Sequence, residues 1–161
     1  MKTLDFVARV KVYEDRFELP DDWQKLLEKA GQAAQKAYTP YSHFNVGAAL
    51  LLNNGEVVTG NNQENAAYPS GLCAERTAVF YASAQYPDVP FNKIAITAIN
   101  KNEKLTKPIS PCGSCRQALL EYEQKFQQRI EVLLAGEEGE IYVFQSVEDL
   151  LPFSFSSSYL L

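Results

Sequence analysis

The sequence predicts an α/β domain with three layers (α/β/α), in which helices cover both faces of a central mixed sheet. Segments with strand-like and helix-like apolar patterns alternate along the chain, which is typical of this class. The 161 residues fit one domain with its own core, because 46% of them are hydrophobic and 22% are charged. We expect a five-stranded sheet in the main domain, residues 21–161, and an extra strand from the N-terminal extension, residues 1–20.

The N-terminal part of the chain contains a strand followed by a helix. Residues 5–17 alternate in places between apolar and charged side chains, which indicates a strand. The helix begins at Pro20, with acidic residues in its first turn and apolar residues at helical spacing after it. We expect this helix to run to about Ala37, because Thr39-Pro40 ends it.

A hairpin follows the first helix. The apolar runs 44–52 and 56–62 flank Asn53-Asn54-Gly55, and this combination favours a tight turn between two strands. Residues 63–71 then form a polar loop. The second half continues the alternation with a helix over 72–85, a strand over 93–100, a helix over 113–126, strands over 130–135 and 140–145, and a short helix over 146–151.

Charge and cysteine content limit the kinds of partner and compartment. The formal net charge is -5, which disfavours nucleic acid as a partner, because its phosphates are bound by clusters of Lys and Arg. No apolar stretch is long enough to cross a membrane, and the N-terminus lacks the apolar core of a signal peptide. We therefore expect a cytoplasmic protein without membrane contact, whose three cysteines need an explanation other than disulfides.

The three cysteines have the spacing of a metal site. Cys73 lies at the start of one predicted helix, and Cys112 and Cys115 lie within one turn at the start of another. Helix N-termini stabilise thiolates, and thiolates are ligands that suit zinc. Structural zinc sites use four protein ligands, whereas catalytic sites leave one position to water. His43, the only histidine, would make the site structural if it bound as the fourth ligand.

Glu75 favours the catalytic interpretation. It lies two residues after Cys73 on the same helical turn, where a carboxylate can act on a water beside the metal. Arg76 follows it and is placed to donate to the sulfurs, which offsets their negative charge. The Cys112-x-x-Cys115 spacing alone is a weak signal that also fits a redox pair or two buried thiols. Its combination with Cys73 and Glu75 is much more specific.

Three segments resemble the small, homotetrameric, zinc-dependent cytidine deaminases. They are YTPYSHFNVGAALL at 38–51, TGNNQENAAYPSGLCAERTAVFYA at 59–82 and SPCGSCRQALLE at 110–121. The resemblance runs from about residue 24 to residue 157 and implies a cytidine deaminase-like fold. It also implies the hydrolytic deamination of cytidine and deoxycytidine to uridine and deoxyuridine with release of ammonia, a reaction of pyrimidine salvage.

The resemblance also implies roles for individual residues. Cys73, Cys112 and Cys115 would hold one Zn²⁺ per subunit, and Glu75 would be the catalytic proton carrier, with Arg76 beside the metal ligands. The residues implied in substrate binding are Phe44, Asn62, Gln63, Glu64, Tyr68, the backbone of Ala74, and Phe155, which a neighbouring subunit lends to the site. The expected partners are therefore a small nucleoside and other copies of the chain, in a homotetramer with shared active sites.

Two alternative functions stay open. Deaminases of other cytosine-containing compounds, such as blasticidin S, share the metal motif, although Asn62 and Glu64 favour a nucleoside because they can bind sugar hydroxyls. A zinc-stapled interaction module would instead use His43 as its fourth ligand. Editing of a polynucleotide is disfavoured by the acidic net charge. Phe44 and Phe155 also fit structural roles, because phenylalanine is common in cores.

Overall fold

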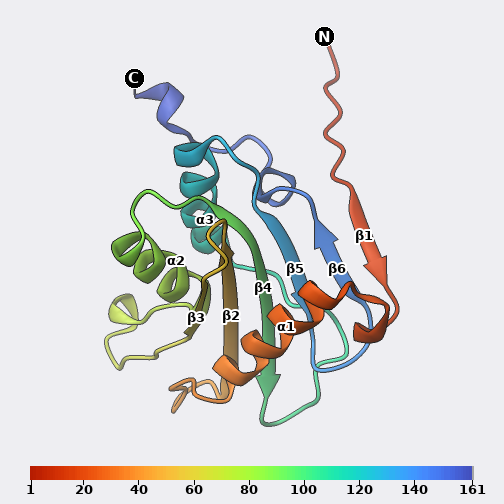
Figure 1. Ribbon diagram of the computed structural model, residues 1–161, viewed down its shortest axis with the longest axis vertical. Helices are drawn as coiled ribbons and strands as arrows, with labels where there is room; N and C mark the ends of the chain where they lie inside the picture. The colour runs from red at the N-terminus through yellow and green to blue at the C-terminus, as the bar shows by residue number, and fades with distance from the viewer. Residues whose placement is uncertain (161) are drawn as a thin grey trace.

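The computed structural model describes residues 1–160 and contains a six-stranded sheet with helices on both faces (Figure 1). The strand order is β1-β6-β5-β4-β2-β3; β4 and β5 are parallel and the other neighbours are antiparallel. The elements are β1 (Val10–Tyr13), α1 (Asp21–Ala34), β2 (Phe44–Leu52), β3 (Val57–Asn61), α2 (Ala74–Gln85), β4 (Phe91–Asn100), α3 (Gly113–Phe126), β5 (Glu131–Ala135) and β6 (Ile141–Phe144). The predicted three-layer fold, with its extra N-terminal strand, is confirmed.

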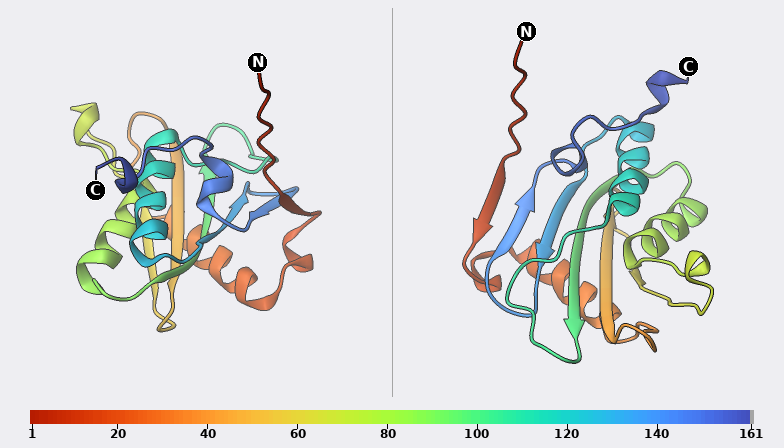
Figure 2. Two further views of the ribbon diagram at one scale, coloured as in Figure 1. Left: turned by 90° about the horizontal axis from the view of Figure 1, so that it is seen from above. Right: turned by 180° about the vertical axis from the view of Figure 1, so that it is seen from behind.

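Two hydrophobic clusters fill the spaces between the layers. On one face of the sheet, α1 packs Trp23 and Leu26 against residues that include Ala49. On the other face, α2 and α3 pack against a larger cluster that includes Leu50 and Ile94 (Figure 1, Figure 2). Because successive side chains of a strand point to opposite faces, β2 contributes to both clusters. Its burial on both faces explains why its sequence is continuously apolar rather than alternating.

Local hydrogen bonds set the ends of several elements. The β2–β3 hairpin turns at Gly55, which has a φ of 87° that glycine adopts without strain. The first helix ends at Ala34 rather than near Ala37, because the N–H of Ala37 already bonds the carbonyl three residues back. The short helix after β6 is a 3-10 turn, and the Ser146 hydroxyl caps it as predicted by accepting from the Glu148 N–H at 3.1 Å.

Gly60 allows α2 to contact β3 at backbone distance. A Cβ at this position would lie 2.3 Å from the Ala74 carbonyl oxygen and 2.6 Å from the Ala78 nitrogen. Both atoms belong to the helix that begins directly after Cys73. The start of α2, and therefore the predicted metal ligand Cys73, can take this position because residue 60 is a glycine and has no side chain.

We expect Gly60→Ala to destabilise the fold by about 1–3 kcal/mol, because the methyl group would push α2 away from the sheet. The free energy of unfolding in urea measures this effect. Gly31→Ala is the matched control, since a Cβ at Gly31 meets nothing within 4 Å and alanine favours a helix. Equal stability of the two variants would contradict the close packing of α2.

The N-terminal extension adds β1 to the edge of the sheet beside β6. Val10 lies opposite Phe144 and Tyr13 lies opposite Ile141. Leu161, the last residue of the expected main domain, lies outside the described residues. Within residues 1–160, no helix is both long and apolar enough to cross a membrane.

Candidate active site

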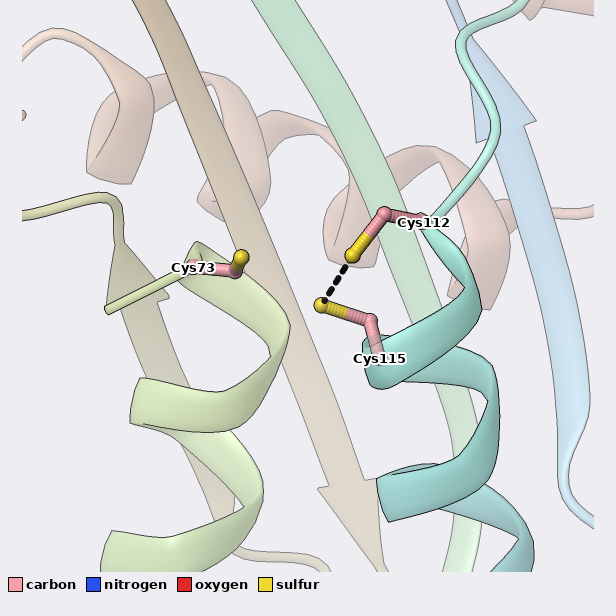
Figure 3. A group of neighbouring side chains, drawn as sticks. All are labelled: Cys73, Cys112 and Cys115. Carbon is pink, nitrogen blue, oxygen red and sulfur yellow. Dashed lines mark hydrogen bonds between the residues drawn. The ribbon is translucent and has the colours of Figure 1, made fainter. Parts of the chain in front are cut away.

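The three cysteines come together where the N-termini of α2 and α3 meet. Cys73 and Cys112 are the residues directly before these helices, and Cys115 lies in the first turn of α3. The three Sγ atoms all lie within 4.8 Å of one another, and the Cys112 and Cys115 sulfurs are 3.5 Å apart (Figure 3). All three thiols are free of disulfides. The cluster that the spacing predicts is therefore present.

The geometry of these sulfurs fits a zinc ion. Ligands about 2.3 Å from a tetrahedral zinc lie about 3.8 Å apart, which is close to the separations seen here. Both helix N-termini direct N–H groups and positive dipole ends toward the sulfurs, which favours thiolates. Among residues 1–160, the group contains only the three cysteines, and His43 is exposed and outside it. The interaction-module alternative thus lacks its proposed fourth ligand.

The charges of the cysteine cluster are unequal. The Cys115 thiol donates a hydrogen bond to Cys73, which, with help from Arg76, lowers the pKa of Cys73 to about 5. The same interaction and burial raise the pKa of Cys115. The Arg76 guanidinium donates a hydrogen bond to the Cys73 sulfur at 3.4 Å, so its positive charge lies directly beside this sulfur. The lowered pKa of Cys73 favours the thiolate, which is the form of cysteine that binds a metal ion.

Glu75 lies in the first turn of α2 and is only 4% exposed. Burial raises the pKa of its carboxyl above the usual value, because a charged carboxylate is poorly solvated there. The same residue lines a cavity that also includes Cys73 and Cys112. A buried carboxyl group thus opens onto the cavity beside the sulfurs without belonging to the sulfur group.

The cavity has a volume of about 690 Å³. Six of the seven residues expected to bind substrate line it: Phe44, Asn62, Gln63, Glu64, Tyr68 and Ala74. Phe155 does not line the cavity of its own chain; it is 58% exposed and its ring stacks on Tyr159 at 5.6 Å. The structure therefore gathers all the expected binding residues of one chain except the one expected to act on a neighbour.

Asn62 and Glu64 connect the end of the hairpin to the start of β2 and to the loop before it. The Asn62 side chain accepts from the Val46 N–H at 2.7 Å and donates to the Phe44 carbonyl at 2.9 Å. The Glu64 carboxylate accepts from the Tyr41 N–H at 2.9 Å and from the next residue at 3.3 Å. The Ser42 hydroxyl, and after it these two N–H groups, lower the pKa of Glu64 by hydrogen bonding to its carboxylate. Both residues thus fix the cavity wall that carries Phe44.

Sequence reasoning missed several residues that line the cavity. Tyr41 contacts Tyr68 edge-to-face, with ring centroids 6.3 Å apart, and both rings lie at the exposed rim. Ser110 and Leu72 also line the cavity. Ser110 precedes Pro111-Cys112, so its proximity to a metal ligand in the sequence was a signal that could have identified it. Tyr41 offered no such signal, because its contact depends on a loop distant in sequence.

We expect Arg76→Gln to weaken zinc binding by about 10–100-fold, because it removes the guanidinium that contacts the Cys73 sulfur. Competition with a chromogenic chelator measures the zinc affinity. Arg129→Gln makes the same chemical change at an exposed position and serves as the control. Unchanged affinity in Arg76→Gln would show that the guanidinium does not support the metal.

A mixed α/β sheet with three convergent cysteines beside a buried glutamate defines a zinc-dependent deaminase domain. The family model for the cytidine and deoxycytidylate deaminase zinc-binding region matches residues 20–128, which include all three cysteines. The chain belongs to this family.

Individual relatives agree with this assignment. A cytidine deaminase of Halalkalibacterium halodurans is 40% identical over 136 residues, which cover 84% of this chain and 96% of that protein. One from Mycobacterium tuberculosis is 43% identical over 105 residues, which cover 65% and 74%. The crystal structure of cytidine deaminase from Burkholderia pseudomallei superimposes with a TM-score of 0.71 and 44% identity, covering 81% of this chain and 97% of that one.

Proposed function

We propose that this chain catalyses the hydrolytic deamination of cytidine and deoxycytidine to uridine and deoxyuridine, with release of ammonia. The observation that carries the proposal is the placement of Glu75: its buried carboxyl group opens onto the cavity beside the three sulfurs. A structural zinc site would have no use for a carboxyl group in this position. The names of the relatives support cytidine as the substrate.

Zinc held by Cys73, Cys112 and Cys115 would supply a Lewis acid that makes water a better nucleophile. Glu75 accepts a proton from the attacking water and delivers it to N3 of the cytosine ring. Once the C4–O bond has formed, Glu75 takes the remaining proton from the new C4 hydroxyl and transfers it to the N4 amine, and the C4–N4 bond then breaks as the C4 carbonyl forms. Water and cytidine thus give uridine and ammonia, and the carboxyl group returns to its initial state.

The cavity walls provide groups for the rest of a nucleoside. Phe44 offers an aromatic face for the pyrimidine, and the Ala74 backbone offers polar groups for the base edge. Asn62 and Glu64, with Gln63 between them, offer amide and carboxylate groups to the ribose hydroxyls. Asn62 already bonds the start of β2 and Glu64 already bonds the loop before it, so substrate binding would add to an ordered wall.

We also propose a homotetramer in the cytoplasm, with one Zn²⁺ per subunit and active sites shared between subunits. Phe155 and Tyr68 are both largely exposed, which leaves them available to a neighbouring site. The three free cysteines are compatible with a reducing compartment. The main domain, residues 21–161, would carry the catalytic site, and residues 1–20 would lie outside it.

The direct test is turnover of cytidine by the zinc-loaded protein, followed as loss of absorbance, together with a metal analysis. We expect one zinc per chain and measurable turnover of both cytidine and deoxycytidine. Blasticidin S, assayed in parallel, distinguishes the alternative deaminase. Turnover of blasticidin S without turnover of either nucleoside would overturn the proposal, as would zinc binding without any deamination.

We expect Glu64→Gln to raise KM for cytidine by at least about tenfold with a smaller change in kcat, because hydrogen bonds to charged groups contribute about 1.5–3 kcal/mol. Steady-state kinetics measure both constants. Glu56→Gln is the control, since Glu56 is exposed in the β2–β3 turn, away from the cavity. An unchanged KM in Glu64→Gln would exclude Glu64 from ribose binding.

A further inference from the structure

The N-terminal segment has the pattern of a strand longer than β1. Within residues 3–13, every second residue is apolar: Leu4, Phe6, Ala8, Val10 and Val12. In an extended strand, these side chains would share one face. Such alternation over several residues is typical of a half-buried strand. In the described part of the chain, only residues 10–13 of this segment pair with another strand, because β6 offers four residues, Ile141–Phe144. The strand pattern therefore extends beyond the pairing that one chain supplies.

The unpaired part of this segment is exposed. In the described chain, pairing with β6 starts at Val10, and the segment before it runs away from the body of the molecule (Figure 1, Figure 2). Leu4 is 78% exposed and Val12 is 50% exposed. Phe6 has one aromatic neighbour, Phe153, at 6.4 Å between ring centroids, and is still 48% exposed. An apolar strip on an open sheet edge favours pairing with another strand.

We propose that residues 3–13 pair antiparallel with the same residues of a second copy, with the two-fold axis at Ala8. Directly opposite residues in an antiparallel pair point to the same side of the sheet. In this register, the apolar side chains of the two copies face one another: Leu4 opposite Val12 and Phe6 opposite Val10. Within residues 1–160, the outer edge of β1 has no partner strand, because β1 is the last strand of the sheet.

The charged residues of the segment favour this register over its neighbours. With the axis at Ala8, Asp5 faces Lys11, and Lys2 faces Glu14 just beyond the paired residues, so both pairs of opposite charges are attractive. The remaining charged residue, Arg9, faces Val7. With the axis at Arg9, that residue faces its own copy, which is repulsive. An axis at Val7 retains only one attractive pair, between Asp5 and Arg9, because Lys2 then faces Val12 instead of Glu14.

The charge pattern also identifies the occupant as a second copy. A segment whose first part complements its own last part, in both charge and apolar character, is self-complementary in an antiparallel pair. The pairing would join two sheets through their β1 edges. This surface is separate from the proposed function, since the family model begins at residue 20 and the cavity contains no residue of the segment.

Cross-linking through a cysteine at the two-fold axis tests the pairing directly. In the zinc-loaded full chain, Ala8→Cys places the two new sulfurs opposite one another, at Cα separations of about 4.5–5.5 Å that allow a disulfide. Under mild oxidation we expect a covalent dimer on a non-reducing gel. Val7→Cys is the control, because its two copies would lie two residue pairs apart along the strands and not opposite one another. The unmodified chain controls for its own three cysteines.

Charge reversals in the Ala8→Cys background test the register. Asp5→Lys and Lys11→Asp each place like charges opposite one another in both symmetric pairs, so we expect each to slow dimer formation by about tenfold. The double variant restores opposite charges and should recover the original rate. The two single variants change net charge in opposite directions, so a common loss cannot come from net charge. Circular dichroism checks that each variant is folded.

Each outcome of this experiment decides for or against the pairing. A dimer from Ala8→Cys, little from Val7→Cys and recovery in the double reversal would support it. No dimer from Ala8→Cys, or equal dimer from Val7→Cys, would overturn it. A double reversal that stays as slow as the single ones would also overturn the register, since the pairing depends on Asp5 facing Lys11.

Discussion

Replacement of Glu75 by glutamine should leave zinc in place and reduce kcat for cytidine by at least about 10²–10⁴-fold. Glutamine keeps the shape of the buried side chain but cannot accept and return a proton, and general acid–base catalysis contributes about this factor. Stopped assays over long incubation measure the residual rate, and metal analysis measures zinc. The residual rate of this variant would come from the zinc ion and from substrate binding by the walls of the cavity.

The matched control is Glu121→Gln, which makes the same change at an exposed position of α3. It should keep full activity. If Glu75→Gln lost its zinc, Glu75 would be supporting the metal site instead of carrying protons. If it kept both zinc and full activity, another group would carry the proton, and the proposed role of Glu75 would be wrong.

Replacement of Cys112 by serine should lower the zinc content well below one ion per chain and remove activity with it. Only three protein ligands are available in the described sulfur group, so the loss of one leaves two, too few for a stable zinc site. Inductively coupled plasma mass spectrometry of the purified protein measures the zinc. The melting temperature should also fall, because an ion that binds only the folded chain stabilises it.

Ser114→Ala is the control, since Ser114 is exposed between the two ligands of α3. A chelator added to the unmodified chain should lower the melting temperature to the value of Cys112→Ser, and should have little further effect on that variant. A variant that keeps one zinc per chain would show that Cys112 is not a ligand. A variant that loses zinc but keeps its activity would show that the metal is not catalytic.

The sequence predicts the elements near strong local signals most accurately. The bounds of α3 and β2 agree with the predicted ranges 113–126 and 44–52, because Pro111 and Gly113 mark the start of α3, and a continuous apolar run before Asn53-Asn54-Gly55 marks β2. The metal cluster is predicted equally well, since two of its ligands share one turn and the third starts another helix. The end of α1 is wrong by three residues, because short-range hydrogen bonds after Ala34 carry no clear sequence signal.

Contacts between distant segments are the part that the sequence does not predict. The expectation for Asn62 and Glu64 concerned a ligand, whereas the structure also shows them bonded to the backbone of residues 41–46. The contact between Tyr41 and Tyr68 depends on how two loops meet. Such contacts follow from tertiary packing and not from local pattern, so they become visible only in the assembled fold.

The separation of the metal ligands along the chain determines when zinc can bind during synthesis. Cys73 lies about 40 residues before Cys115, so at about 5–20 residues per second the first ligand is made about 2–8 s before the last. Until α3 has been made and has packed beside α2, a nascent chain offers one isolated thiol and no site for the ion. Metal loading is therefore a late event in the biosynthesis of this protein, and it follows completion of the second helical layer.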